Sequence, residues 1–165
     1  MIFKILKVFH IVAICVFVGS IPSHIILGEI AQVMPLGESF VAIYKTKAVL
    51  TYGLTAAGLA MSVISGGLIV LRHRAMLKTP WLRLKLVLVA GIVINAVKNL
   101  IPIAKDMSVL AAQAAEAGSL PPEFLGLKAQ EAIFGPINLA LIICVIILSV
   151  AKPSLWKKVR RAQHG

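Results

Sequence analysis

The stretch AIFGPINLALIICVIILSVA, residues 132–151, is long, apolar and free of charged side chains. A helix rises about 1.5 Å per residue, so about 20 residues cross the hydrocarbon core of a bilayer. Three more apolar stretches of similar length run from Val8 to Leu27, from Ala48 to Leu71 and from Leu86 to Ala104. A lipid-exposed backbone must satisfy its own hydrogen bonds, so each stretch predicts a transmembrane helix.

The composition indicates a membrane protein with no room for a separate soluble module. Hydrophobic residues make up 59% of the 165 residues, and the mean hydropathy is +0.96, well above that of soluble domains. We therefore expect an all-α fold, a four-transmembrane-helix bundle in which residues 1–165 form a single domain. The expected helices cover approximately residues 5–31, 48–73, 81–105 and 130–151.

The charged residues are divided unequally among the polar segments. The N terminus, the second loop and the C terminus hold 12 of the 17 basic residues and no acidic residue. The first and third loops hold the other five basic residues and all six acidic ones. Because Lys and Arg are retained on the cytoplasmic side, we expect both termini in the cytoplasm and a multi-pass protein of a bacterial inner membrane. The net charge of +11 then meets anionic lipid in the bilayer and does not indicate nucleic acid.

Histidines inside the apolar stretches are the first candidates for a functional role. His10 lies in the first stretch, where an ionisable side chain is costly and often functional. Its imidazole can ligate a metal, relay a proton or hydrogen-bond a neighbouring helix, and the pattern leaves these roles open. His24 lies 14 residues further on, near the same helix face but roughly 21 Å away along the axis. We interpret it as an outer-surface residue beside Pro22, the alternative being a ligand of a second cofactor stacked across the bilayer.

A second set of candidates lies outside the first helix. His73 is the histidine best placed to join His10 as a metal ligand, although its basic neighbours also suit an interfacial cluster. Asn95, Lys98 and Asn99 share a region of the third helix, where Lys98 either snorkels outward or receives an anion in a pocket. The polar side chains that could complete such a pocket come from the fourth helix and are Glu131 and Asn138.

Small residues recur at about four-residue spacing along the second helix. They are Gly53, Ala57, Gly58, Ser62 and Gly66. Such a stripe lets two helices approach closely, and it equally makes room for a flat cofactor. We favour close packing.

Three short motifs resemble those of a known group of membrane proteins. They are KVFHI at residues 7–11, WLRLKL at residues 81–86 and IILSVAKP at residues 146–153. The combination resembles the HemJ-type protoporphyrinogen oxidases and the related CopD-like copper-resistance membrane proteins. The resemblance implies a four-helix inner-membrane protein associated with haem b. It also implies that His10 is a haem ligand and that Lys85 is a functionally important residue.

Together these features predict a haem-b-binding inner-membrane protein that acts in electron transfer or in oxidation of a lipophilic substrate, a porphyrinogen or a quinol. His10 is the expected axial ligand, with His73 as the candidate second metal ligand. Lys85 is the candidate catalytic residue, and Arg83 beside it is expected to pair with a propionate or a substrate carboxylate. The expected partners are the lipid bilayer and either a second copy of the chain or a membrane redox partner.

Two other functions are consistent with the pattern. The CopD-like resemblance suggests copper handling or transport, but the soft ligands Cys15, Met61 and Cys144 are few and form no visible ladder. The second alternative is a non-catalytic membrane subunit or assembly factor, with the small-residue stripe as its contact face.

Overall fold

The computed structural model describes residues 2–151, and every regular element in that range is helical. The elements are α1 (Ile2–Val33), α2 (Glu38–Leu50), η1 (Thr51–Ala56), α3 (Ala57–Arg72), η2 (Arg74–Lys78), α4 (Pro80–Asn95), η3 (Ala96–Leu100), α5 (Ile101–Ala117) and α6 (Pro122–Ala151). The segments η1 and η3 are π-helical turns, and η2 is a short 3₁₀ helix. Because the π-helical turns continue into the α-helices on both sides, these elements form four continuous helical rods.

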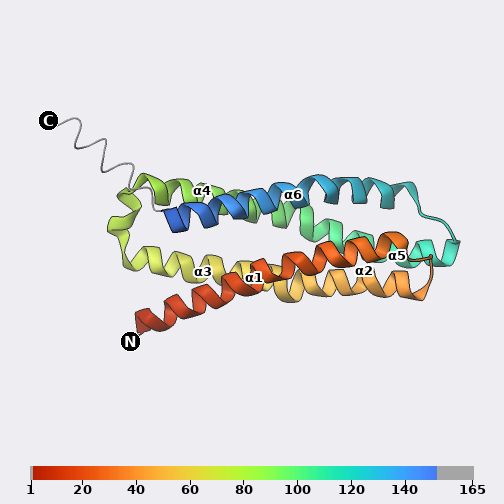
Figure 1. Ribbon diagram of the computed structural model, residues 1–165, viewed down its shortest axis with the longest axis horizontal. Helices are drawn as coiled ribbons and strands as arrows, with labels where there is room; N and C mark the ends of the chain where they lie inside the picture. Colours follow the sequence, from red (N-terminus) through yellow and green to blue (C-terminus); the bar gives the residue numbers. More distant parts are fainter. Residues whose placement is uncertain (1, 152–165) are drawn as a thin grey trace.

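The four rods are long and apolar enough to cross a membrane, which confirms the predicted fold class. The first is α1, the second runs from α2 through α3, the third from α4 through α5, and the fourth is α6. We call them spans 1 to 4. Both the start of α1 and the end of α6 lie at one end of the bundle, beside η2 (Figure 1). We call this the terminal end, and the opposite end, which holds the two other connections, the loop end.

The spans extend further toward the loop end than the hydropathy pattern predicted. Span 2 begins at Glu38 rather than near residue 48, and span 3 continues to Ala117 rather than ending near residue 105. Span 4 begins at Pro122 rather than near residue 130. The shortest span has 30 residues and the longest 38, more than the roughly 20 that hydrocarbon requires. The extra turns pack against one another at the loop end.

Local sequence signals explain where these helices begin and end. Thr79 has an extended backbone and Pro80 occupies the first turn of α4, where its missing N–H costs nothing. Gly118 ends α5 in the left-handed region, at φ 70°, which favours glycine. Pro22 and Pro136 lie inside α1 and α6, so neither proline ends its helix.

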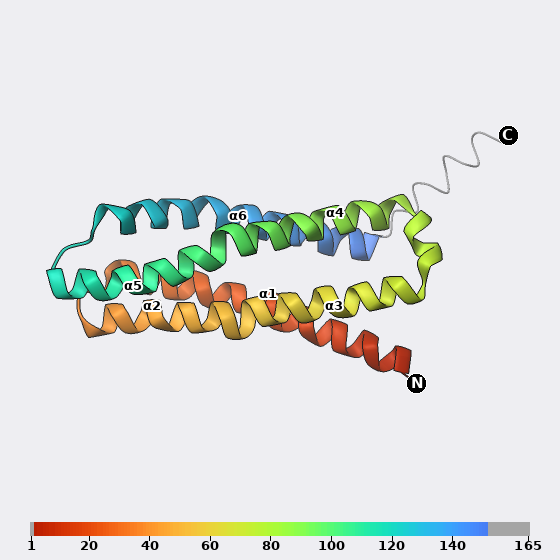
Figure 2. The same cartoon turned by 180° about the vertical axis from the view of Figure 1, so that it is seen from behind.

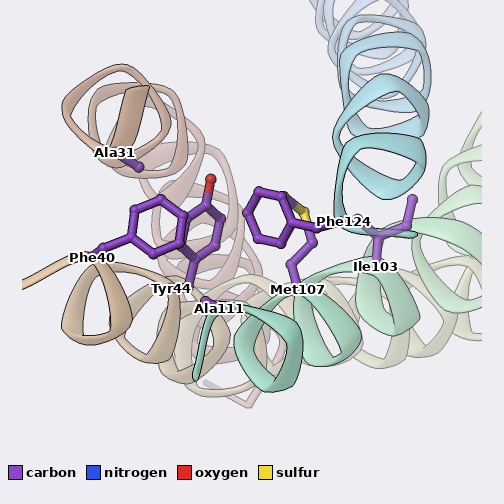
Figure 3. Packing of buried hydrophobic residues seen from close by; sticks show 7 residues of the cluster. All are labelled: Ala31, Phe40, Tyr44, Ile103, Met107, Ala111 and Phe124. Atoms are coloured by element: carbon purple, nitrogen blue, oxygen red, sulfur yellow. The ribbon is translucent and has the colours of Figure 1, made fainter. Parts of the chain in front are cut away.

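Two apolar clusters hold the bundle together. At the loop end the rings of Phe40 and Tyr44 from α2 and Phe124 from α6 lie within 6 Å of one another, as judged by centroid distances of 4.9, 5.7 and 5.1 Å. Met107 and Ala111 of α5 close this cluster from below (Figure 3). The exposed fraction of Phe124 is only 1%, so this end of the bundle has a packed protein core.

The second cluster lies near the middle of the bundle, where all four spans meet. It joins Phe17 of α1, Leu59 of α3, Ile92 of α4 and Ile142 of α6. Toward the terminal end the closest packing is within two pairs, α1 with α3 and α4 with α6, as Figure 2 also shows. The middle cluster therefore separates a loop-end half from a terminal-end half.

The outer surface of the bundle is apolar on every span. Val8, Val49, Val87 and Ile147, one from each span, are 61%, 69%, 66% and 57% exposed. Exposed aliphatic side chains in such numbers are costly in water and suited to lipid tails. This surface supports a protein embedded in a bilayer.

Candidate functional site

In the terminal-end half, His10 of α1 contacts α3. Its Nδ1 lies 2.9 Å from the hydroxyl oxygen of Ser65, a side chain that is only 1% exposed. The Ser65 hydroxyl donates its proton to the carbonyl of Met61, at 2.6 Å. Since a hydroxyl has one proton, Ser65 accepts from His10, and Nδ1 is the protonated nitrogen. The Nε2 atom of the same ring is then an acceptor.

Gly66 makes room for the His10 ring. A Cβ atom at Gly66 would lie 3.0 Å from Cε1 of His10 and 3.7 Å from its Nε2. The glycine of the small-residue stripe therefore accommodates the imidazole edge against α3. The structure brings His10 and the stripe together, which the sequence pattern did not specify.

Lys85 of α4 is half-buried and lies within electrostatic range of His10. Arg83, two positions earlier, is exposed and donates from Nε to the carbonyl of Leu77 at 2.9 Å. Its side chain thus binds the backbone of the η2 connection. Within residues 2–151, Arg83 forms no hydrogen bond with His10 or Lys85.

His73 lies apart from His10 along the helix pair. It is exposed at the end of α3, and its ring meets that of Phe3 edge-on at a centroid distance of 4.7 Å. Phe3 precedes His10 by seven residues, so the two imidazoles are separated by about two helical turns, roughly 10 Å. His10 contacts Ser65 whereas His73 contacts Phe3, so the two histidines lie at different levels of the helix pair α1 and α3.

In the loop-end half, a partly open cavity of about 400 Å³ lies between span 1 and span 4. The side chains and backbone of α1 and α6 form its two walls, and α2, η1, η3 and α5 form its floor. Its surface is mostly apolar, with a few polar groups gathered from different helices. This combination is typical of small-molecule binding sites.

An ion pair lies on the wall of this cavity. Nζ of Lys47 in α2 donates to both carboxylate oxygens of Glu131 in α6, at 2.8 and 3.1 Å. The Lys47 side chain is 5% exposed and that of Glu131 is 32% exposed. Tyr44, one turn before Lys47, places its ring 5.3 Å from the ammonium group. The pair ties span 2 to span 4, and its carboxylate remains accessible from the cavity.

His24 also lines the cavity, which corrects our interpretation of it as an outer-surface residue. Its Nε2 lies 3.0 Å from the hydroxyl oxygen of Thr55 in η1, and Thr55 lies 2.8 Å from the hydroxyl of Ser20. The Ser20 hydroxyl donates to the carbonyl of Phe17 at 2.7 Å. Thr55 belongs to span 2. The hydrogen bond between His24 and Thr55 therefore directs the His24 ring toward the inside of the bundle.

The predicted polar pocket of the third and fourth helices forms only in part. Asn95 donates to the side chain of Asn138 at 3.3 Å and to the carbonyl of Phe134 at 3.0 Å, and Asn99 donates to Asn95 at 2.9 Å. Lys98 is exposed and does not line the cavity, which fits the snorkelling interpretation. The cation that pairs with Glu131 is Lys47 and not Lys98.

No cluster of three or more His, Cys, Asp or Glu side chains suited to a metal ion occurs within residues 2–151. Cys15 and Cys144 are exposed on the bundle surface and form no disulfide. The basic C-terminal cluster, residues 152–161, lies outside the described residues. Two polar sites thus remain as candidates, one around His10 and one around the cavity.

These features define a polytopic integral membrane protein of four helical spans, with polar groups held inside the bundle in both halves. The chain belongs to the family described as predicted integral membrane protein (DUF2269), whose model matches residues 4–153. No curated protein and no solved structure matches the chain.

Proposed function

We propose that this protein binds haem b through His10 and acts in electron transfer or in oxidation of a lipophilic substrate in a bacterial inner membrane. The proposal rests on the resemblance of residues 7–11 and 81–86 to the HemJ-type group. It gains support from one observation, the hydrogen bond from Nδ1 of His10 to the Ser65 hydroxyl.

That hydrogen bond matters because it selects a tautomer. An imidazole that donates from one nitrogen presents the lone pair of the other to a metal, and the donor bond fixes the ring orientation. His10 has this arrangement, with Ser65 accepting and Gly66 leaving room for the ring. The residues present would therefore let Nε2 of His10 hold a haem iron.

The neighbouring residues suit a negatively charged group at the terminal end. Lys85 is half-buried within range of His10, and an ammonium group in such a setting attracts a carboxylate strongly. Bound haem would supply the redox chemistry, and the chain would supply its ligand and a cation for a carboxylate. The two-turn separation makes His73 a poor second ligand for the same iron, so we propose His10 as a single protein ligand.

The test is the visible spectrum of the purified protein, oxidised and reduced. We expect a haem Soret band that His10→Ala removes and His73→Ala leaves unchanged. Ser65→Ala should retain the band at reduced occupancy, because the ligand remains and only its orientation is released. A wild-type protein without haem after expression in haem-replete cells, or a His10→Ala protein with full haem, would contradict the proposal.

Copper handling is less well supported. The two cysteines lie on the bundle surface at Cys15 and Cys144, and the described residues contain no cluster of metal-ligating side chains. A colourless protein that is purified with stoichiometric copper would favour this function over haem binding.

A further inference from the structure

The cavity at the loop end is a second site, distinct from the His10 site in the other half of the bundle. Its volume of about 400 Å³ lies within the range of small-ligand pockets, roughly 300–1,000 Å³. Ile25 of α1 and Pro136 of α6 line it and are also exposed on the lipid-facing surface. A ligand therefore has access from the bilayer, which favours a lipophilic molecule.

The ion pair offers both a donor and an acceptor to such a ligand. An ammonium group has three N–H donors, and Lys47 directs two hydrogen bonds to the Glu131 carboxylate. Gly28, on the opposite wall, has no side chain, and a Cβ there would lie 3.6 Å from the Lys47 Nζ. The third N–H can thus meet a ligand oxygen, while the partly exposed Glu131 can accept from a ligand hydroxyl.

The hydrogen bonds around His24 add an acceptor. Ser20 donates to the Phe17 carbonyl, so it accepts from Thr55, and Thr55 in turn accepts from Nε2 of His24. The proton then sits on Nε2, and Nδ1 of His24 is the acceptor nitrogen. His24 lies within electrostatic range of both Lys47 and Glu131, so these polar groups share one region of the cavity.

We propose that this cavity binds the ring of a membrane quinone or quinol. A ring with two oxygens matches the polar groups, because a carbonyl accepts from Lys47 and hydroxyls donate to Glu131 and His24. The ligand is neutral, and so is the Lys47–Glu131 pair taken together. Of the two lipophilic substrates, the quinol with its two oxygens matches these few polar groups, whereas a porphyrinogen carries four pyrrole N–H groups and several carboxylates.

This inference deepens the proposed redox function and rests on it for the fate of the electrons. Binding itself involves only the loop-end half. The two ideas can therefore fail separately, because haem content reports on His10 and quinone affinity reports on the cavity.

The first experiment fills the cavity without changing charge. A Cβ at Gly135, which lines the cavity, meets nothing within 4 Å, so the position has room for the start of a side chain, and Gly135→Leu adds apolar volume at the cavity wall. Gly126 has equally open surroundings on the same helix and does not line the cavity, which makes Gly126→Leu the matched control. Titration calorimetry with a short-chain benzoquinone should show affinity weakened at least about tenfold by Gly135→Leu and unchanged by Gly126→Leu.

The second experiment removes the acceptor. Glu131→Gln keeps the shape of the side chain and should weaken binding of the reduced quinol more than that of the quinone, because only the quinol donates to the carboxylate. Glu123, exposed two turns earlier on α6, provides the control Glu123→Gln. If Glu131→Gln fails to fold, the Gly135→Leu comparison still decides.

The outcomes separate the alternatives. Equal quinone affinity in the wild type and Gly135→Leu would overturn the inference, as would co-purified phospholipid that excess benzoquinone does not displace. Quinone binding that survives in a haem-free His10→Ala protein supports the cavity site on its own. A wild-type protein that binds quinone but never contains haem keeps this inference and removes the proposed haem function.

Discussion

At the scale of single residues, the Lys47–Glu131 pair places two charges in a largely buried setting. Transfer of two charges from water into a protein interior costs several kcal/mol per ion, which good pairing geometry offsets. Both carboxylate oxygens of Glu131 accept from the same ammonium group, and the Lys47 side chain is nearly inaccessible. Each partner therefore depends on the other for its place in the bundle.

This dependence predicts the outcome of a double-mutant cycle. Lys47→Met should reduce the free energy of unfolding by about 3–5 kcal/mol, because it leaves a carboxylate without its cation. The double variant Lys47→Met with Glu131→Leu should recover most of the loss, since both charges are then absent. Unfolding in mixed detergent micelles, followed by circular dichroism, provides the measurement. A double variant that is less stable than the single one would show that the pair has no mutual dependence.

Sequence reasoning missed Lys47 for a physical reason. A hydropathy pattern treats a lysine as the border of a span, so the expected helix began at residue 48. Glu131, its partner, lies 84 residues away, and nothing local links the two. The tyrosine at position 44 and the phenylalanine at position 40 were the available signal, because they continue the helical spacing of buried side chains past Lys47.

At the scale of helices, the contact of α1 with α3 depends on Gly58. A Cβ at this position would lie 2.8 Å from the backbone nitrogen of Phe17 and 3.0 Å from its Cα. Backbone atoms cannot rotate away as a flexible side chain can. The middle of the bundle therefore tolerates no side chain there without a shift of one helix.

We expect Gly58→Ala to destabilise the protein by about 1–3 kcal/mol, as overpacking does in other tight interiors. Gly53 lies on the same stripe, but a Cβ there meets nothing within 4 Å. Gly53→Ala should therefore be neutral or slightly stabilising, by up to about 1 kcal/mol, since alanine is the better helix former. Thermal unfolding of the two variants in one detergent compares them directly, and equal losses would contradict the close-approach argument.

The small-residue stripe was predictable as a packing face, but its glycines differ in how closely a neighbouring helix approaches them. Gly58 meets the backbone of α1 and Gly66 meets the His10 ring, whereas Gly53 has open space. The spacing identifies a face of the helix. Only the crossing point of the two helices, which depends on all four spans, decides which glycine is indispensable.

At the scale of the whole molecule, the four spans were predictable because hydrocarbon thickness sets a minimum apolar length. Their extra turns were not, since these turns pack around Phe124 through contacts between distant segments, which a hydropathy pattern does not contain. The orientation in the membrane is a separate matter, and the sequence pattern that bears on it is the concentration of 12 basic residues in the N terminus, the second loop and the C terminus. We propose that this end is cytoplasmic.

The orientation can be measured with a reporter phosphatase that is active only outside the cytoplasm. Fusion at the C terminus should give no activity, because the positively charged end is retained inside. Insertion after Gly118, in the turn between α5 and α6, should give full activity. The control is expression level by immunoblot, and the reverse pattern of activity would invert the proposed topology.

The π-helical turns η1 and η3 interrupt spans 2 and 3 at the floor of the loop-end cavity, on the side toward the His10 site. A turn of this kind carries one residue more than an α-helical turn, so it changes the rotational phase of everything beyond it by roughly 100°. If η1 formed an ordinary α-helical turn with no residue lost, the length, charge and hydropathy of span 2 would stay the same. The change would nevertheless turn α3 relative to α2, so that Lys47 and Ser65 would no longer keep their present relative orientation. Membrane insertion and the correct relative setting of the two halves are therefore separate requirements on this chain, and a relative that meets the first need not meet the second.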